Sequence, residues 1–218
     1  VSPYLAFGKT YGKMTGMPVG LIQTSLGGSP MERWNPKDGD LYLNMVDKIH
    51  ETGGRYAGVL WYQGCSDTNP GPAEKYLEHF REYVEATRKE LGYEIPFFTM
   101  QLNRQINGIN DECWGMVRDA QARAAKEIPG VSVLTTSNLS LCDGIHNTAQ
   151  ANVALGEKLA KQCAHVLNGK EEYQPPELVK VERADEAERK SFQLEGSGIW
   201  LKLTCDHVKN CFLVYSAV

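Results

Sequence analysis

The sequence of 218 residues has little of several features that mark specialised protein classes. It has no excess of basic charge, because 23 Lys and Arg stand against 27 Asp and Glu and the net charge is -4. Such a chain has no general attraction to a phosphate backbone or an anionic bilayer. Its longest apolar runs, Gly58 to Tyr62 and Ile95 to Phe98, are far shorter than the roughly 20 residues of a transmembrane helix. We therefore expect neither nucleic acid nor a membrane as a partner.

The sequence motifs of common cofactor sites are also missing. The chain has no Gly-x-Gly-x-x-Gly pattern and no glycine-rich loop followed by Gly-Lys-Ser/Thr, which argues against dinucleotide and P-loop sites. Six cysteines occur, but without a Cys-x-x-Cys pair or a Cys/His cluster at zinc-like spacing. In a chain of this size, most of them are interpreted as buried free thiols. The sequence predicts no metal and no cofactor.

The first residues contain no initiator methionine and no signal-peptide pattern, since Val1 to Gly8 has neither a charged start nor an apolar core segment. The last residues, Val214 to Val218, fall within a strand-like run. We therefore expect the chain to be a piece of a longer protein.

The chain does contain a regular alternation of helix and strand patterns up to about residue 168. Short apolar runs typical of buried strands alternate with longer segments whose apolar residues recur at helical spacing. Strands separated by helices favour parallel pairing with helices on both faces. The predicted fold class is α/β, a three-layer α/β/α sandwich with a mostly parallel, flavodoxin-like sheet. Strands are expected at 18–24, 57–62, 95–102 and 131–136, and helices at 3–14, 41–52, 73–91, 114–127 and 148–167.

After Gly169 the pattern changes. The linker-like sequence Gln174-Pro175-Pro176 precedes runs that alternate like half-exposed antiparallel strands. Three short strands cannot bury a core alone. We expect one domain over residues 1–170 and part of a β-rich accessory domain over 171–218, with strands at 191–194, 199–204 and 212–218.

Ligand sites of open parallel sheets lie beyond the carboxyl ends of the strands, which singles out four loops. The most informative loop contains Asp143 and His146. An Asp three residues before a His can accept a hydrogen bond from the imidazole and fix its tautomer, which leaves the other ring nitrogen free as a general base. A capping or surface histidine gives the same pattern. The four loops are Ser25–Ser29, Gln63–Asp67, Gln101–Arg104 and Asp143–His146.

Other features of these loops have both a catalytic and a structural interpretation. Gly27 and Gly28 expose backbone N–H groups that suit an oxyanion hole, or they form a tight turn. The Gln63 amide can donate to a developing oxyanion, or it satisfies its own turn. Cys65 is a candidate nucleophile with His146 as base, or it is a buried thiol. The nearby aromatic residues suit either the core or a wall for a sugar ring: Trp34, Trp61, Tyr62 and Trp114.

Four segments of the chain carry a recognisable pattern, and they follow one another along the sequence. They read PVGLIQTSLGGSPMERW at Pro18–Trp34, LWYQGCSD at Leu60–Asp67, VRDAQ at Val117–Gln121 and DGIH at Asp143–His146. In this order they resemble the sialate O-acetylesterases and the related acetylxylan esterases of the SGNH (GDSL-like) hydrolases. The likeness covers roughly residues 3 to 168, and a β-rich tail fits the longer members of the family.

The resemblance implies hydrolysis of acetyl esters on sugars by a serine nucleophile, through an acyl-enzyme and without a metal. An O-acetylated sugar is then the expected substrate. By position, His146 resembles the general base and Asp143 its orienting partner. Secreted, periplasmic and lysosomal locations are all compatible with the family, so the compartment stays open.

The resemblance also assigns supporting roles. Gly27 or Gly28 is similar to the glycine donor of the oxyanion hole, and Gln63 is similar to its polar donor. Arg118 and Gln121 match a recurring Arg/Ala-Gln pattern that is expected to brace the site. Ser25, Cys65, Arg118 and Trp34 are expected to line it.

Three departures from the family pattern bear on activity. Cys65 stands where Glu is usual, and Asn147 follows His146 where Pro is usual. The family's nucleophilic serine lies in a Gly-Gln-Ser-Asn or Gly-Asp-Ser block on the first strand, and the sequence has no such block. We expect a segment upstream of Val1, or another chain, to supply this serine, with Ser25 as the alternative nucleophile. The chain alone is then expected to be inactive.

Two other classes of function stay open at this point. One is a catalytically inactive carbohydrate-binding relative of the esterases, which the replacement of Glu by Cys65 favours. The other is a flavodoxin-like signalling or cofactor domain, although the sequence contains no phosphate-binding loop that would support it.

Overall fold

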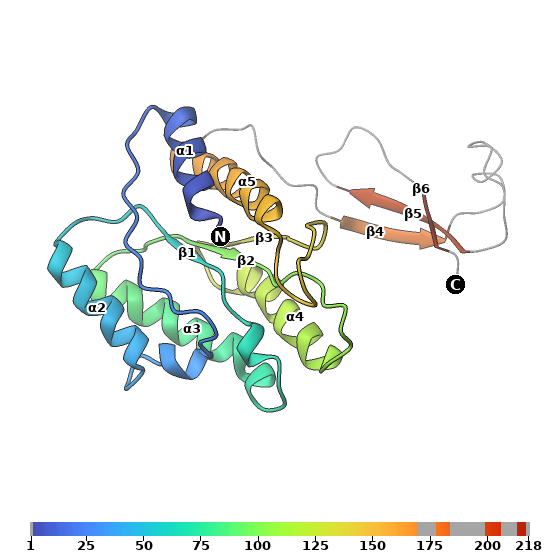
Figure 1. The fold of residues 1–218 in the computed structure, drawn as a ribbon, viewed down its shortest axis with the longest axis horizontal. Coiled ribbons are helices and arrows are strands. Elements are labelled where there is room, and N and C mark those ends of the chain that lie inside the picture. The colour runs from blue at the N-terminus through green and yellow to red at the C-terminus, as the bar shows by residue number, and fades with distance from the viewer. Residues whose placement is uncertain (1, 170–177, 184–198, 206–212, 217–218) are drawn as a thin grey trace. The chain divides into compact units, whose positions relative to one another are not determined.

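The computed structural model describes residues 2–169, 178–183, 199–205 and 213–216 (Figure 1). The chain divides into two compact units, Val1–Lys170 and Glu171–Val218. The two units are described separately below.

The first unit alternates helices with strands. Its strands are β1 (Val59–Trp61), β2 (Phe97–Met100) and β3 (Val131–Leu134), and its α-helices are α1 (Tyr4–Thr15), α2 (Asp40–Thr52), α3 (Pro72–Leu91), α4 (Asp111–Glu127) and α5 (Ala149–Asn168). Two short 3-10 helices, η1 (Met31–Trp34) and η2 (Cys65–Asp67), lie in the connections. None of the helices in the described ranges combines the length and apolar character needed to cross a membrane.

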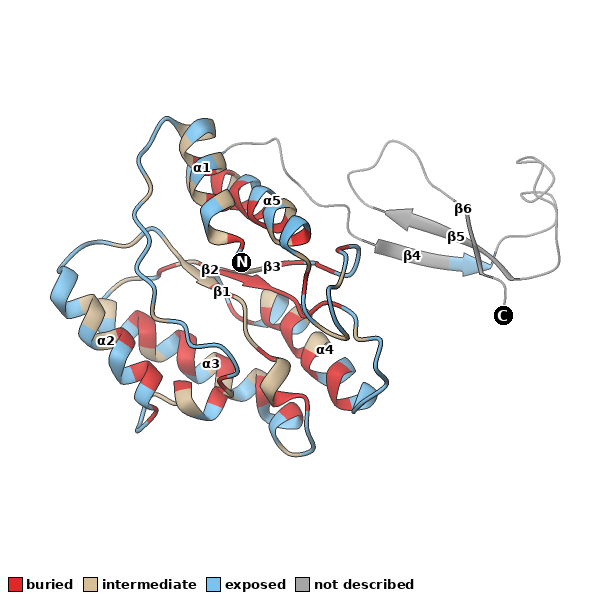
Figure 2. Cartoon of the chain, viewed as in Figure 1, coloured by how far each residue is buried: buried red, intermediate tan, exposed pale blue. Residues whose placement is uncertain are grey.

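The three strands form one parallel sheet in the order β1-β2-β3. Every residue of the central strand β2 is buried, whereas β1 and β3 also contain half-buried residues (Figure 2). Helices α1 and α5 cover one face of the sheet, and α2, α3 and α4 lie on the other (Figure 1). The predicted α/β fold with three layers and a parallel sheet is therefore confirmed.

An aromatic cluster fills the layer between the sheet and α3. Trp34 and Trp61 meet edge to face with ring centroids 5.1 Å apart, and Trp61 lies 4.6 Å from Tyr83. Phe97 on β2 contacts the same tyrosine edge to face. Trp34 and Trp61 are only 3% and 5% exposed, which favours the core interpretation of these aromatic residues over a wall for a sugar ring.

The expected strand at 18–24 is wrong. This segment is irregular, and its apolar side chains Leu21 and Ile22 are 49% and 42% exposed. A strand needs a neighbour to satisfy its backbone N–H and C=O groups, and the described sheet of the first unit contains only β1, β2 and β3. Apolar character alone therefore did not produce a strand here.

The second unit contains an antiparallel sheet in the order β4-β5-β6. Its strands are β4 (Leu178–Arg183), β5 (Ile199–Cys205) and β6 (Leu213–Ser216), and the pairing of β4 with β5 is irregular between Leu178 and Lys180. The strands predicted at 199–204 and 212–218 correspond to β5 and β6, whereas β4 was not predicted. The strand expected at 191–194 lies outside the described residues.

Candidate active site

The loops that leave the carboxyl ends of the three parallel strands are joined by hydrogen bonds. The Thr136 hydroxyl, after β3, donates to the carbonyl of Gln101, after β2, at 2.8 Å. The Asn103 amide donates to the carbonyl of Leu139 at 3.2 Å. Gln121 of α4 donates at 2.9 Å to the carbonyl of Gln63, after β1. These hydrogen bonds therefore connect the loops that carry the candidate residues at this edge of the sheet.

A small hairpin after β3 carries Asp143 and His146. Leu141 and Asn147 form an isolated antiparallel bridge, and the Cys142 N–H donates to the His146 carbonyl at 2.9 Å. One Asp143 oxygen accepts the N–H groups of Ile145 and His146 at 2.8 and 2.7 Å. This side-chain-to-backbone turn leaves the second carboxylate oxygen facing the imidazole.

That second oxygen lies 2.8 Å from Nδ1 of His146. Hydrogen bonds from the Ile145 and His146 backbone and from the imidazole hold the pKa of Asp143 at about 2, so the carboxylate is ionised at neutral pH. An ionised acceptor favours the tautomer with the proton on Nδ1. The His146 side chain is 63% exposed, and within the described chain Nε2 has no hydrogen-bond partner. The geometry can thus present a basic nitrogen to a molecule in solution.

Asn147 stands where the resembled family usually has proline. Its side chain connects this hairpin to residues that follow the ends of β1 and β2. Its side-chain oxygen accepts a 2.7 Å hydrogen bond from Asn103, and its amide donates to the Tyr62 hydroxyl at 3.1 Å. Asn147 is 8% exposed. The sequence showed this residue only as a departure from the usual proline, and its partners Asn103 and Tyr62 were not predicted because they are far away along the chain.

Gln63 lies at the end of β1 with all of its polar side-chain atoms engaged. Its oxygen accepts the Tyr76 hydroxyl at 3.1 Å. Its amide nitrogen donates to the Ser29 carbonyl at 2.9 Å and to the Asp67 carboxylate. A primary amide has two N–H donors, so in this arrangement neither remains for a ligand.

Asp67 is a buried carboxylate that sequence reasoning did not single out. It is 3% exposed and accepts the Met31 N–H at 3.0 Å as well as the Gln63 amide. Burial raises the pKa of this carboxyl above its usual value, against the lowering effect of its hydrogen bonds. Asp67 therefore joins the start of η1 to the end of β1.

The segment before η1 holds the remaining predicted residues. Gly27 and Gly28 are exposed, and Gly28 has a left-handed φ of 71° that favours glycine. Ser25 is also exposed, and no hydrogen bond joins it to His146. Trp34 is buried and donates from Nε1 to the Ser29 hydroxyl at 3.1 Å. The structure thus links Gln63 to this segment through Ser29, and Trp34 stabilises the segment from the core side.

Cys65 is a half-buried thiol in η2. Burial, together with the nearby charges of Asp143 and Asp67, raises its pKa to about 11. The nucleophilic form of cysteine is the thiolate, which is scarce at neutral pH under these conditions. The environment is unfavourable for Cys65 as a nucleophile.

Arg118 and Gln121 lie one turn apart on α4. Gln121 is 1% exposed and accepts the Leu102 N–H at 2.8 Å, in addition to donating to Gln63. Arg118 donates to the Ser137 hydroxyl at 2.6 Å. Both side chains therefore contact loops at the carboxyl end of the sheet.

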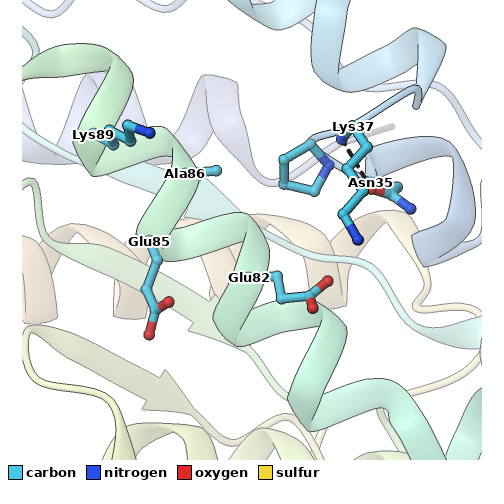
Figure 3. Close-up of a pocket in the computed structure, with 7 residues that line it drawn as sticks. Asn35, Lys37, Glu82, Glu85, Ala86 and Lys89 are labelled. Carbon is cyan, nitrogen blue, oxygen red and sulfur yellow. Dashed lines mark hydrogen bonds between the residues drawn. The ribbon is translucent and has the colours of Figure 1, made fainter.

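A surface hollow of about 300 Å³ lies elsewhere, between α3 and the residues after η1 (Figure 3). The Ala86 methyl group points toward that segment. The charged side chains that line the hollow are those of Glu82, Glu85, Lys37 and Lys89. None of its lining residues belongs to the loops described above. In the part of the chain that the structure describes, no three His, Cys, Asp or Glu side chains gather as a metal site.

An exposed Asp–His pair at the carboxyl end of a parallel α/β sheet is an arrangement that esterases and related hydrolases use. The family model described as "Carbohydrate esterase, sialic acid-specific acetylesterase" matches residues 1–165. The chain belongs to this family.

Two relatives are similar to this chain. A protein of Arabidopsis thaliana, described as a probable carbohydrate esterase, is 30% identical over 149 residues, which are 66% of this chain and 54% of that protein. Its crystal structure matches with a TM-score of 0.68 and 27% identity over 77% of this chain and 69% of the solved one. A carbohydrate acetylesterase from Xanthomonas citri matches in fold, with a TM-score of 0.71 and 24% identity over 92% of this chain and 46% of that one. The chain spans about half the length of the curated relative it matches.

Proposed function

We propose that this chain forms the histidine and aspartate part of a carbohydrate O-acetylesterase that works through a Ser-His-Asp triad. The observation that carries the proposal is the 2.8 Å hydrogen bond between Asp143 and Nδ1 of His146, with Nε2 open to solvent. Family membership supports an esterase acting on carbohydrates. The substrate proposed is an acetyl ester on a sugar of the sialic acid or xylan type.

In the proposed mechanism, Nε2 of His146 takes the proton from a serine hydroxyl as its oxygen attacks the acetyl carbonyl. The resulting oxyanion accepts hydrogen bonds from backbone N–H groups, for which Gly27 and Gly28 are the candidates. Collapse releases the sugar alcohol, which receives the proton from His146, and leaves an acetyl-serine. Water, deprotonated by the same imidazole, then releases acetate. Asp143 holds the imidazole and stabilises its charged form throughout.

The proposed serine comes from a segment upstream of Val1, or from another chain. Ser25 is exposed on an irregular segment and is the candidate within the sequence itself. One experiment distinguishes the two possible sources of the serine. In it, p-nitrophenyl acetate and an O-acetylated sialic acid are assayed with this chain and with a version extended upstream.

Turnover by the extended version and not by this chain is the expected result. His146→Ala should abolish that turnover, and Asp143→Asn should lower kcat by orders of magnitude because it removes the anion that orients and stabilises the imidazole. Full activity of His146→Ala would show that the base is another residue. Activity of this chain that disappears in Ser25→Ala would instead identify Ser25 as the nucleophile.

A catalytically inactive carbohydrate-binding relative is the second candidate. It is favoured by Cys65, whose neutral thiol stands where the resembled family has a carboxylate. Binding of an acetylated sugar by the extended version, without any turnover, would support this alternative.

A further inference from the structure

The hydrogen bonds that join Asp143 to His146 all lie within one turn of the hairpin. The carboxylate accepts the backbone N–H groups of Ile145 and His146 and faces Nδ1 of the imidazole. Such local contacts fix the shape of the pair. They do not fix where the pair lies relative to the other loops at the carboxyl ends of the strands, and both side chains are more than half exposed.

Asn147 supplies contacts of the other kind, because its amide reaches residues that follow two other strands. Its oxygen accepts the Asn103 amide at 2.7 Å, and its nitrogen donates to the Tyr62 hydroxyl at 3.1 Å. Burial raises the pKa of Tyr62 to about 12, so the phenol stays neutral near pH 7 and this contact does not change with pH in that range. One side chain thus connects the hairpin to the loops after β1 and β2.

Asn103, the partner after β2, is itself held in place. It is 1% exposed, and its carbonyl accepts Nε1 of the buried Trp114 at 2.7 Å. Its amide also donates to the Leu139 carbonyl. Asn147 is 8% exposed, so water has little access to compete for these hydrogen bonds. The hairpin is therefore hydrogen-bonded to a buried residue that has further partners of its own.

The two side-chain contacts depend on asparagine at this position. The backbone bridge of the hairpin uses the N–H groups of Cys142 and Thr148, and it does not use that of Asn147. Proline, the usual residue here in the resembled family, could therefore keep the bridge, but it can form neither side-chain hydrogen bond. Alanine likewise removes both.

We propose that Asn147 is a positioning residue, which aligns the Asp143–His146 hairpin with the loops after β1 and β2 and so places Nε2 of His146 for proton transfer. The inference rests on the proposed function, and it adds a residue that acts on the reaction through His146. A displacement of about 1 Å in a catalytic group can reduce a rate on the order of 100-fold. Loss of the two hydrogen bonds should therefore lower kcat, although the Asp143–His146 pair itself stays intact.

The first test measures the alignment without turnover, by NMR on this chain. The Ile106 N–H, in the loop after β2, donates to the Gly144 carbonyl at the tip of the hairpin at 3.0 Å. In Asn147→Ala this amide should exchange with solvent at least about tenfold faster, which is the size expected from the loss of two neutral hydrogen bonds. The nitrogen chemical shifts of the His146 ring should stay as in the parent, because its contact with Asp143 is local.

The second test measures turnover of p-nitrophenyl acetate by the version extended upstream. Asn147→Ala and Asn147→Pro should each reduce kcat by about 10- to 100-fold, and the pH profile of the remaining activity should keep the shape of the parent's profile. Tyr62→Phe removes one of the two contacts and should cause a smaller loss. A purely structural role would lower the midpoint of urea unfolding and leave kcat of the folded protein unchanged.

Asn138→Ala is the matched control. Asn138 lies in the same connection between β3 and α5, and its side-chain oxygen accepts a hydrogen bond from Lys158 of α5 at 3.2 Å. Its replacement should leave both kcat and the exchange of the Ile106 amide unchanged. An equal effect of the two alanine substitutions would show that any change in this connection disturbs the hairpin, and it would overturn the role of Asn147.

The outcomes separate the positioning role from the function. Full kcat in Asn147→Pro would overturn the role, because the backbone alone would then align the hairpin. Unchanged exchange of the Ile106 amide in Asn147→Ala would overturn it as well, and so would a shifted pH profile, which would place the damage in the Asp143–His146 pair. No turnover by the extended parent would count against the esterase proposal, and exchange of the Ile106 amide would then decide the alignment by itself.

Discussion

Replacing Gln121 by leucine should destabilise the first unit by about 2 kcal/mol. Its side chain is 1% exposed and accepts the Leu102 N–H at 2.8 Å while donating to the Gln63 carbonyl at 2.9 Å and to the Tyr76 hydroxyl at 3.3 Å. Leucine of similar volume removes all three hydrogen bonds. The Gln63 carbonyl keeps a second donor, the Tyr76 hydroxyl at 3.2 Å, so Leu102 N–H is the group left unsatisfied.

A buried unsatisfied N–H costs about 1–3 kcal/mol, which sets the expected size of the effect. Gln162→Leu supplies the matched control. Gln162 is also a buried helical glutamine, at 6% exposure, but its oxygen is already without a partner in the described structure and its amide makes one 3.2 Å bond to the Val133 carbonyl. Its replacement removes an unsatisfied oxygen, which offsets the loss of the one bond to the Val133 carbonyl, so the change should stay within about 1 kcal/mol.

The assay is equilibrium unfolding of each variant in urea, followed by tryptophan fluorescence and circular dichroism. The midpoint for Gln121→Leu should fall with an unchanged m-value, since the surface exposed on unfolding is the same. Equal destabilisation by the two substitutions would refute the reasoning, because it would mean that burial of the glutamine and not its hydrogen bonds sets the cost.

Two further predictions concern neighbours of Gln63. Gly64→Ala should be destabilising by about 1–3 kcal/mol in the same urea assay, because Gly64 has a φ of 141° and an added Cβ would lie 3.0 Å from the Gln121 amide nitrogen; an unchanged midpoint would contradict this. For Asp67, burial raises the pKa in the folded state, so the folded protein binds more protons than the unfolded chain as the pH rises from about 4. The contribution of Asp67 to the free energy of unfolding should therefore fall as the pH rises through that range. When the free energy of unfolding is measured between pH 4 and pH 7, the Asp67→Asn variant should not show this decrease. A pH dependence identical in the two proteins would speak against a buried, proton-sensitive carboxylate.

The helices could be predicted because their amphipathic pattern is local. The helix expected at 73–91 is observed as Pro72–Leu91, and the one expected at 148–167 as Ala149–Asn168. The segment 18–24 failed because a strand depends on a neighbour, which the pattern of one segment does not reveal. The expected strand at 57–62 is reduced to Val59–Trp61 for a related reason, since its pairing with β2 covers only three residues.

In the candidate site too, only the contacts between residues close together in the sequence could be predicted. Asp143 and His146 are three residues apart, so their hydrogen bond follows from local geometry that the sequence displays. The contacts between Asn147 and Asn103 and between Gln63 and Ser29 join residues 44 and 34 positions apart. Such pairs depend on how the loops at the carboxyl ends of different strands meet. Asparagine and glutamine occur in so many structural roles that their presence in the sequence does not predict these contacts.

The hydrogen bonds of Gln63 bear directly on how an oxyanion could be stabilised. Both amide hydrogens are engaged, one by the ionisable Asp67 and one by the Ser29 carbonyl. Hydrogen bonds to an ionised acceptor are stronger than those to a neutral carbonyl, so a ligand would displace Ser29 more readily than Asp67. Release of the Ser29 carbonyl would remove one contact of the segment with Gly27 and Gly28, which Trp34 and Asp67 would still hold through Ser29 and Met31. In this arrangement Asp67 holds the Gln63 amide, and the Ser29 carbonyl is the partner that a ligand would have to replace.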